Sequence, residues 1–176
     1  MNVIEAQILL FIQEHMRCDA LTPLMQLMSR LGDAGMGWII FGLVLLIFAK
    51  TRRGGLDMLL CLAACFCVCN LIIKPLAARI RPYEVAETLD ILVSVPTDYS
   101  FPSGHTASSF ACATALTRAF GKKGAWSFAF AALIALSRLY VGVHYPTDVL
   151  CGALLGAGIS WITYSLLHRR KSTAPA

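Results

Sequence analysis

The sequence predicts an all-α fold, a polytopic membrane helical bundle of five to six membrane helices that include amphipathic N-terminal helices. Hydrophobic residues make up 57% of the 176 residues, charged residues make up 14%, and the mean hydropathy is +0.68. Soluble domains carry about 25% charged residues. The apolar residues are gathered into stretches near the roughly 20 residues that a helix needs to cross a bilayer. A single integral membrane domain, residues 1–176, is expected.

Two short amphipathic helices are expected within residues 1–31. Residues 3–14 and 21–31 each place apolar side chains at helical spacing on one face and polar side chains on the other. Neither stretch is long enough to span a bilayer alone. Both are therefore expected to lie in the membrane interface or against the bundle.

Five longer apolar stretches are expected to cross the membrane, namely residues 34–49, 56–73, 103–120, 125–141 and 146–167. The second stretch is unusual because it holds four of the seven cysteines. A metal or redox cluster is one interpretation of these thiols. Packing of small, polarizable side chains in a membrane helix is the other, and it is favoured because no Cys-x-x-Cys pair occurs in the sequence.

Basic residues cluster on one side of the expected bundle. They follow the first, third and fifth spans, as Lys50, Arg52, Arg53, Arg118, Lys122, Lys123, Arg169, Arg170 and Lys171. Loops rich in Lys and Arg stay in the cytoplasm. This side, with the tail 168–176, is therefore expected to be cytoplasmic, and the opposite ends of the spans are expected to face outward.

The first polar stretch at the outward side runs from Lys74 to Arg81-Pro82. The two cations are seven residues apart, so they share a helix face if the helix continues past Pro75. One interpretation is a basic anchor that reaches the lipid headgroups. The other is a site for an anion, since positive charge is otherwise avoided on this side.

The second polar stretch, Pro102-Ser103-Gly104-His105, begins the third span. Ser103 suits a helix N-cap, and Gly104 lets a ligand approach the backbone closely. The free N–H groups of a helix N-terminus bind phosphate. An ordinary capped helix start with His105 at the interface is the competing interpretation.

The third polar stretch places Arg138, His144 and Asp148 among apolar residues. An ionisable residue at bilayer depth costs at least about 2.5 kcal/mol, so each is a functional candidate. Arg138 presents a fork of donors that matches phosphate oxygens. Asp148, four residues after His144, can orient the imidazole and leave its other nitrogen as a nucleophile or base. The alternative is a structural ion pair of Arg138 with Asp148.

Together the three stretches supply what phosphoryl transfer requires, which is mostly positioning and charge stabilisation. Lys74, Arg81 and Arg138 could neutralise the charge that Mg²⁺ neutralises elsewhere. No metal and no other cofactor is therefore expected. The acidic residues of loop 83–101 are expected to be solvated, and the loop either forms a lid or headgroup contact or is an ordinary mobile loop.

These residues resemble the three signatures of the type 2 phosphatidic acid phosphatase superfamily, which also includes the vanadium haloperoxidases. The signatures are Lys-x6-Arg-Pro, Pro-Ser-Gly-His and Ser-Arg-x5-His-x3-Asp, and all three are complete within residues 74–148. The resemblance implies that His144 attacks phosphorus to form a phosphohistidine and that Asp148 orients it. It implies that His105 protonates the leaving oxygen. It further implies that the phosphoryl oxygens are held by Lys74, Arg81, Ser103, Gly104 and Arg138.

The resemblance also implies a lipid phosphate substrate, taken from the bilayer by a bacterial-type membrane lipid phosphatase. Undecaprenyl diphosphate is the favoured substrate, and phosphatidylglycerophosphate or phosphatidate is the alternative. No nucleic-acid partner is expected, and the oligomeric state is left open. A non-catalytic lipid-phosphate binding or transport protein is the alternative from a different functional class. Such a protein would not require two histidines and an aspartate at its site. Vanadate-dependent halide oxidation is disfavoured because the chain is a small membrane bundle.

Overall fold

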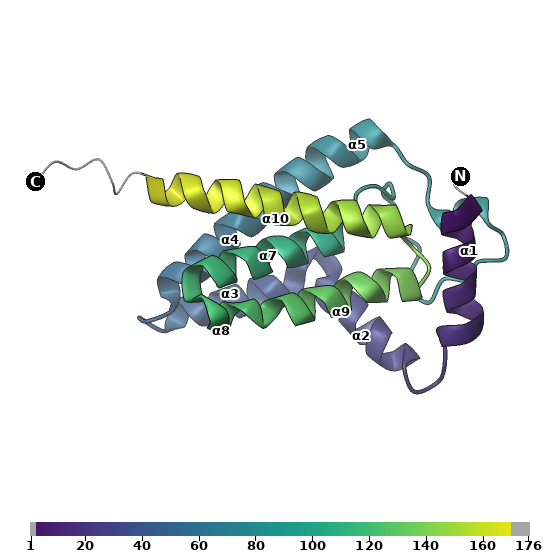
Figure 1. Cartoon of the computed structure of the whole chain (residues 1–176), viewed down its shortest axis with the longest axis horizontal. Helices are drawn as coiled ribbons and strands as arrows, with labels where there is room; N and C mark the ends of the chain where they lie inside the picture. Colours follow the sequence, from purple (N-terminus) through teal and green to yellow (C-terminus); the bar gives the residue numbers. More distant parts are fainter. Residues whose placement is uncertain (1–2, 170–176) are drawn as a thin grey trace, which may run out of the picture.

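The computed structural model describes residues 3–169, and the predicted all-α fold is confirmed (Figure 1). The helices are α1 (Val3–Phe11), α2 (Thr22–Gly32), α3 (Met36–Ile47), α4 (Arg52–Phe66), α5 (Lys74–Ala77), α6 (Pro82–Val85), α7 (Gly104–Phe120), α8 (Lys122–Ala125), α9 (Ser127–Tyr140) and α10 (Pro146–Arg169). Three short segments of other helical pitch are η1 (Ile12–Met16), η2 (Asp33–Gly35) and η3 (Cys67–Ile73). Of the tail 168–176, residues 170–176 lie outside the described residues.

Helix α7 is the centre of the bundle, and it packs against α4, α9 and α10 (Figure 1). Its inward residues are mostly small, which lets the neighbouring helices approach closely. Gly156 of α10 shows how close this approach is, because a Cβ atom there would lie 2.1 Å from the carbonyl oxygen of Ala107. The central helix therefore holds its N-terminus at a fixed position relative to the start of α10.

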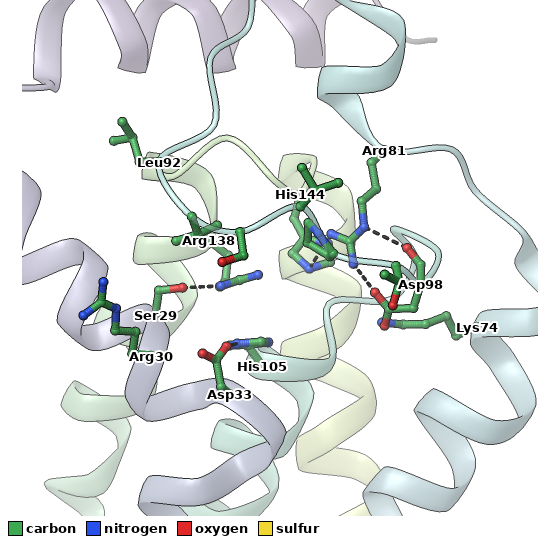
Figure 2. Close-up of a pocket in the computed structure, with 15 residues that line it drawn as sticks. Ser29, Arg30, Asp33, Lys74, Arg81, Leu92, Asp98, His105, Arg138 and His144 are labelled. Atoms are coloured by element: carbon green, nitrogen blue, oxygen red, sulfur yellow. Dashed lines mark hydrogen bonds and ion pairs between the residues drawn. The ribbon is translucent and has the colours of Figure 1, made fainter.

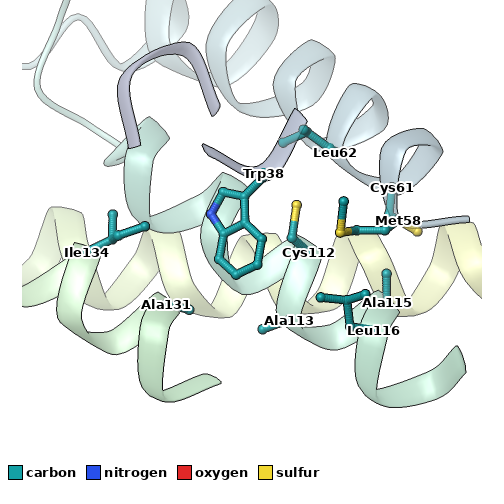
Figure 3. Close-up of a cluster of buried hydrophobic side chains, with 10 residues drawn as sticks. All are labelled: Trp38, Met58, Cys61, Leu62, Cys112, Ala113, Ala115, Leu116, Ala131 and Ile134. Atoms are coloured by element: carbon teal, nitrogen blue, oxygen red, sulfur yellow. The ribbon is translucent and has the colours of Figure 1, made fainter. Parts of the chain in front are cut away.

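The largest cluster of buried hydrophobic side chains lies where α7 packs against α3, α4 and α9 (Figure 3). Trp38 is almost fully buried there, and its indole N–H donates to the Ser109 hydroxyl at 2.9 Å. The seven cysteines are free thiols, and Cys61 and Cys112 belong to this core. Of the four cysteines of the second span, Cys61, Cys65 and Cys69 are fully buried among packed side chains, whereas Cys67 is exposed.

Many large apolar side chains point away from the bundle, as expected for helices that contact lipid. Ile47 and Leu154 are examples, and both are mostly exposed. Three helical segments of the described chain are long and apolar enough to cross a membrane, namely Thr22–Ile47, Arg52–Val85 and Pro146–Arg169. Helices α7 and α9 correspond to the other two expected spans but are shorter, with 17 and 14 residues.

Residues 21–31 differ from the expected separate amphipathic helix. Helix α2 leads directly through η2 into α3, and the chain bends where Ala34 and Gly35 have φ of 50° and 70°. Glycine at the second position adopts this left-handed backbone without a steric penalty. The bend places Asp33 beside the start of α7. Helix α1 meanwhile lies across the end of the bundle where α9 ends and α10 begins (Figure 1).

Candidate active site

A cavity of about 350 Å³ lies at the end of the bundle near α1 and brings the three polar stretches together (Figure 2). Five of the eight site residues expected from the sequence line it, namely Lys74, Arg81, His105, Arg138 and His144. The other three lie behind or beside it. Asp148 and Ser103 are fully buried, and Gly104 lines an adjoining cavity.

His144 follows the turn after α9 and is almost fully buried. Its Nε2 lies 3.4 Å from Nη1 of Arg81, and the arginine can donate to this nitrogen in the tautomer that carries its proton on Nδ1. Burial lowers the pKa of His144 to about 3, and the nearby charges of Arg138 and Arg81 act in the same direction. The imidazole is therefore neutral near pH 7.

Asp148 lies behind His144, at the first turn of α10. Its Oδ2 is 3.6 Å from Nδ1 of His144, which is longer than a hydrogen bond, and that nitrogen has no hydrogen-bond partner among the described residues. The same Oδ2 accepts from the Ser100 hydroxyl at 2.5 Å and from the Tyr145 backbone N–H at 2.9 Å. Catalytic contacts are often long in the absence of substrate. The arrangement leaves the carboxylate in reach of the imidazole.

The cation partner of Asp148 is Arg79, which the sequence analysis did not single out. Nη1 of Arg79 donates to Oδ1 of Asp148 at 2.6 Å, while Nη2 donates to Glu5 at 2.7 Å. The guanidinium also stacks over the Tyr145 ring at 4.1 Å. A structural ion pair between Arg138 and Asp148, the alternative left open by the sequence, is not found among the described contacts. A fully buried carboxylate that needs a nearby cation was the signal that could have pointed to Arg79.

Glu5 connects the N-terminal helix to this network. It is 5% exposed, and one oxygen accepts from both the backbone N–H and the hydroxyl of Thr147, at 3.0 and 2.6 Å. Although burial acts to raise the pKa of Glu5, hydrogen bonds from Thr147 and Arg79 lower it overall. Helix α1 therefore supports the base of the candidate site.

Lys74 and Arg81 do not share a helix face as the continued helix predicted. Helix α5 ends at Ala77, Ala78 has φ of 44°, and Arg81 lies just before α6. Both cations still meet at one carboxylate, that of Asp98. Lys74 donates to one oxygen and Arg81 to the other, each at 2.5 Å (Figure 2).

Asp98 belongs to loop 83–101, for which the sequence predicts a lid or headgroup contact or an ordinary mobile loop. The expectation that the acidic residues of this loop are solvated is wrong for Asp98, because both of its carboxylate oxygens accept from cations. Its side chain is 52% exposed. Although burial acts to raise the pKa of Asp98, the hydrogen bonds and charges of Lys74 and Arg81 lower it to about 2. A carboxylate thus occupies the place where a phosphoryl group would meet these two cations.

Arg138 lies on the opposite wall of the cavity, and its Nη1 donates to the hydroxyl of Ser29 (Figure 2). Its Nε is buried without a hydrogen-bond partner among the described residues. Nearby, Nε2 of His105 contacts Oδ1 of Asp33 at 2.8 Å. Asp33 was not among the site residues expected from the sequence, so this pairing was missed. Helix α2 and η2 thereby complete the cavity wall.

Ser103 occupies the N-cap position of α7, as expected, but its hydroxyl makes no capping hydrogen bond to the backbone. It accepts instead from the Thr106 hydroxyl at 3.0 Å. Among residues 3–169, the side chains of His, Cys, Asp and Glu form no group of three or more that could hold a metal ion. The cationic groups that surround the cavity are arginines and a lysine.

Comparison with known proteins relates this chain to one family. The model of the PAP2 superfamily matches residues 54–172. An undecaprenyl-diphosphatase from Sulfolobus acidocaldarius is 35% identical over 159 residues, which cover 88% of this chain and 73% of that protein. The crystal structure of Aquifex aeolicus LpxE has a TM-score of 0.75 at 28% identity, covering 92% of this chain and 94% of its own.

A second solved structure resembles the fold over nearly the whole chain. The transmembrane PAP2-type phosphatidylglycerolphosphate phosphatase from Bacillus subtilis has a TM-score of 0.76 at 24% identity. The match covers 99% of this chain and 90% of that one. The helical arrangement around the cavity is therefore shared with membrane phosphatases.

Proposed function

This chain belongs to the PAP2 superfamily, and we propose that it hydrolyses a lipid phosphate at the membrane surface through a phosphohistidine on His144. The observation that carries the proposal is the buried imidazole of His144, which lines the cavity with its Nε2 beside Arg81. Burial lowers the pKa of His144, which keeps the imidazole neutral for attack. The favoured substrate is undecaprenyl diphosphate. Phosphatidylglycerophosphate or phosphatidate is the alternative, in keeping with the second solved relative.

The phosphoryl group binds where the Asp98 carboxylate now bridges Lys74 and Arg81. In the transition state of phosphoryl transfer, the negative charge is spread over three nonbridging oxygens, and fixed cations stabilise that charge. Arg138 contributes from the opposite wall, and the N-terminus of α7 at Gly104 contributes backbone donors. Substrate binding therefore requires Asp98 to leave these cations.

The reaction proceeds in two displacements. Nε2 of His144 attacks phosphorus, and the bond from phosphorus to the leaving oxygen breaks while His105 supplies a proton to that oxygen. Water then attacks the phosphohistidine, with His105 accepting its proton, and inorganic phosphate leaves. Asp148 holds the imidazole and stabilises its positive charge, while Asp33 orients His105.

We place the site on the extracytoplasmic face and the C-terminus in the cytoplasm. The turn between α3 and α4 and helix α8, both rich in Lys and Arg, lie at the end of the bundle away from α1 (Figure 1). The positive-inside rule puts that end in the cytoplasm. Protease or thiol-labelling access to each end in intact cells tests this orientation.

Release of inorganic phosphate from purified lipid phosphates, with a chelator present, tests the function. Turnover is expected for wild type and not for His144→Ala. Turnover abolished by the chelator would contradict the cation-based mechanism. Binding of the lipid without phosphate release would instead favour a non-catalytic lipid-phosphate binding protein, and peroxide-dependent halogenation with added vanadate would favour halide oxidation.

A further inference from the structure

A second cavity of about 350 Å³ adjoins the first, and Lys74, Asp98 and His105 line both. It lies between η2 and η3, with Phe66 and Leu71 contributing apolar lining. His144 lines the first cavity only. The two cavities therefore meet at Lys74, one of the cations proposed to bind the phosphoryl group, while Arg81 and Arg138 line the first cavity only.

The direction of attack assigns the second cavity to the leaving group. In phosphoryl transfer the attacking and leaving groups lie roughly in line on opposite sides of phosphorus. His144 attacks from the first cavity, and His105, the proposed acid, reaches both. The leaving oxygen and the lipid attached to it consequently extend into the second cavity, where the apolar wall of Phe66 and Leu71 suits a hydrocarbon chain.

The second cavity contains two polar side chains without a described partner, Asn70 and Ser108. Asn70 is the one polar residue of η3, whose other residues are Cys, Val, Leu and Ile. Its Oδ1 lies 2.7 Å from the point that a Cβ at Gly104 would occupy, so the amide rests directly against the start of α7. Neither side chain forms a hydrogen bond to another residue of the described chain. Asn70 is half-buried, and an amide that faces a cavity in an apolar span without a partner in the described chain is free to bind a ligand.

We propose that Asn70, assisted by Ser108, binds the oxygens of the leaving group and selects a lipid diphosphate over a lipid monophosphate. This inference rests on the proposed function. When a diphosphate is cleaved, the bond between the attacked phosphorus and the bridging oxygen breaks, and the electron pair remains on that oxygen. The lipid keeps the second phosphate, whose oxygens accept hydrogen bonds from the Asn70 amide and the Ser108 hydroxyl. The leaving group of a lipid monophosphate has no second phosphate, so it offers these donors only the oxygen released from phosphorus and the neutral oxygens of the lipid.

The test compares Asn70→Leu with wild type on undecaprenyl diphosphate and on phosphatidate, with the full chain purified in detergent. The substitution is expected to lower kcat/KM on the diphosphate about tenfold or more, because the retained phosphate loses a hydrogen-bond donor. On phosphatidate the change is expected to stay within about threefold. Ile72→Ala, on the same segment but outside both cavities, is the matched control.

An equal fall on both substrates, or no fall on the diphosphate, would overturn the assignment of Asn70. Elution on size exclusion shows whether Asn70→Leu is folded. If it is not, Ser108→Ala, a smaller change, is compared with wild type on the same two substrates. Wild type that cleaves phosphatidate but not the diphosphate would also refute the inference, yet leave the lipid phosphatase function standing. Wild type that cleaves neither of these substrates nor phosphatidylglycerophosphate would contradict the proposed function itself.

Discussion

Arg79 forms a direct ion pair with Asp148, 2.6 Å from Nη1 to Oδ1, and at the same time holds Glu5 of the N-terminal helix. One oxygen of Asp148 is thereby fixed, and the other is directed toward His144. The guanidinium thus acts on the proposed nucleophile through the carboxylate. Arg79 is best described as a positioning residue.

Replacing Arg79 with alanine is expected to lower kcat about 10- to 100-fold with little change in KM, since misorienting a reacting group has costs of this size. Arg79→Lys is expected to retain only part of the activity. Its ammonium group keeps the positive charge but lacks the second nitrogen of the guanidinium fork. Added guanidinium is expected to restore part of the lost rate in Arg79→Ala, since this side chain is 28% exposed. Wild-type kinetics in Arg79→Ala would contradict this role.

Removing the charge of Asp98 is expected to strengthen the binding of free phosphate or orthovanadate. An anion must displace the Asp98 carboxylate from Lys74 and Arg81, so Asp98→Asn is expected to lower the inhibition constant about tenfold. The pKa of about 2 keeps the carboxylate ionised across pH 4–8, and the difference from wild type should be the same throughout that range. Glu87→Gln, an exposed loop substitution, is the control. Weaker vanadate binding in Asp98→Asn would refute the competition.

Burial of neutral His144 is expected to make the fold less stable in mild acid. The imidazole ionises near pH 6.5 in an unfolded chain but only near pH 3 in the folded protein. Between these values the unfolded state binds the extra proton, so stability contributed by this residue falls as pH decreases from 6.5. The drop in Tm from pH 7 to pH 5 should therefore be smaller in His144→Asn than in wild type. An identical drop would indicate that His144 is protonated in the folded state.

The contact between α7 and α10 predicts a sharp difference between two glycines of one helix. Gly156→Ala places a methyl group 2.1 Å from the Ala107 carbonyl oxygen, whereas Gly158→Ala meets nothing within 4 Å. Overpacking of this kind costs about 1–3 kcal/mol. Thermal unfolding in detergent should show a lower Tm for Gly156→Ala and an unchanged or slightly higher one for Gly158→Ala. Equal Tm values would show that the two helices can separate without cost.

The sequence predicted the helical class and the approximate ranges of the helices, because apolar stretches and their breaks are local signals. Two helix starts agree with the sequence: α7 begins directly after Ser103, and α10 begins at Pro146. The joining of α2 to α3 was not predicted, since it depends on backbone angles at Ala34 and Gly35. The bend at Ala78, which separates Lys74 from Arg81 on the helix, was missed for the same reason.

Within the candidate site, the sequence identified the groups that carry charge but not the residues that hold them. Asp33, Arg79 and Asp98 were not assigned to the site because their partners lie far away in sequence. A motif records which residues recur at fixed spacing. It does not record which buried cation pairs with which carboxylate, and that pairing is decided by tertiary packing.

The most direct test of the central claim is to trap the covalent intermediate. Purified protein is mixed with a lipid phosphate labelled in its terminal phosphoryl group and quenched within a single turnover. Mass spectrometry then locates the phosphoryl group. We predict an acid-labile phosphohistidine at His144 in wild type and none in His144→Ala. Label on another residue, or phosphate release by His144→Ala at the wild-type rate, would contradict the mechanism.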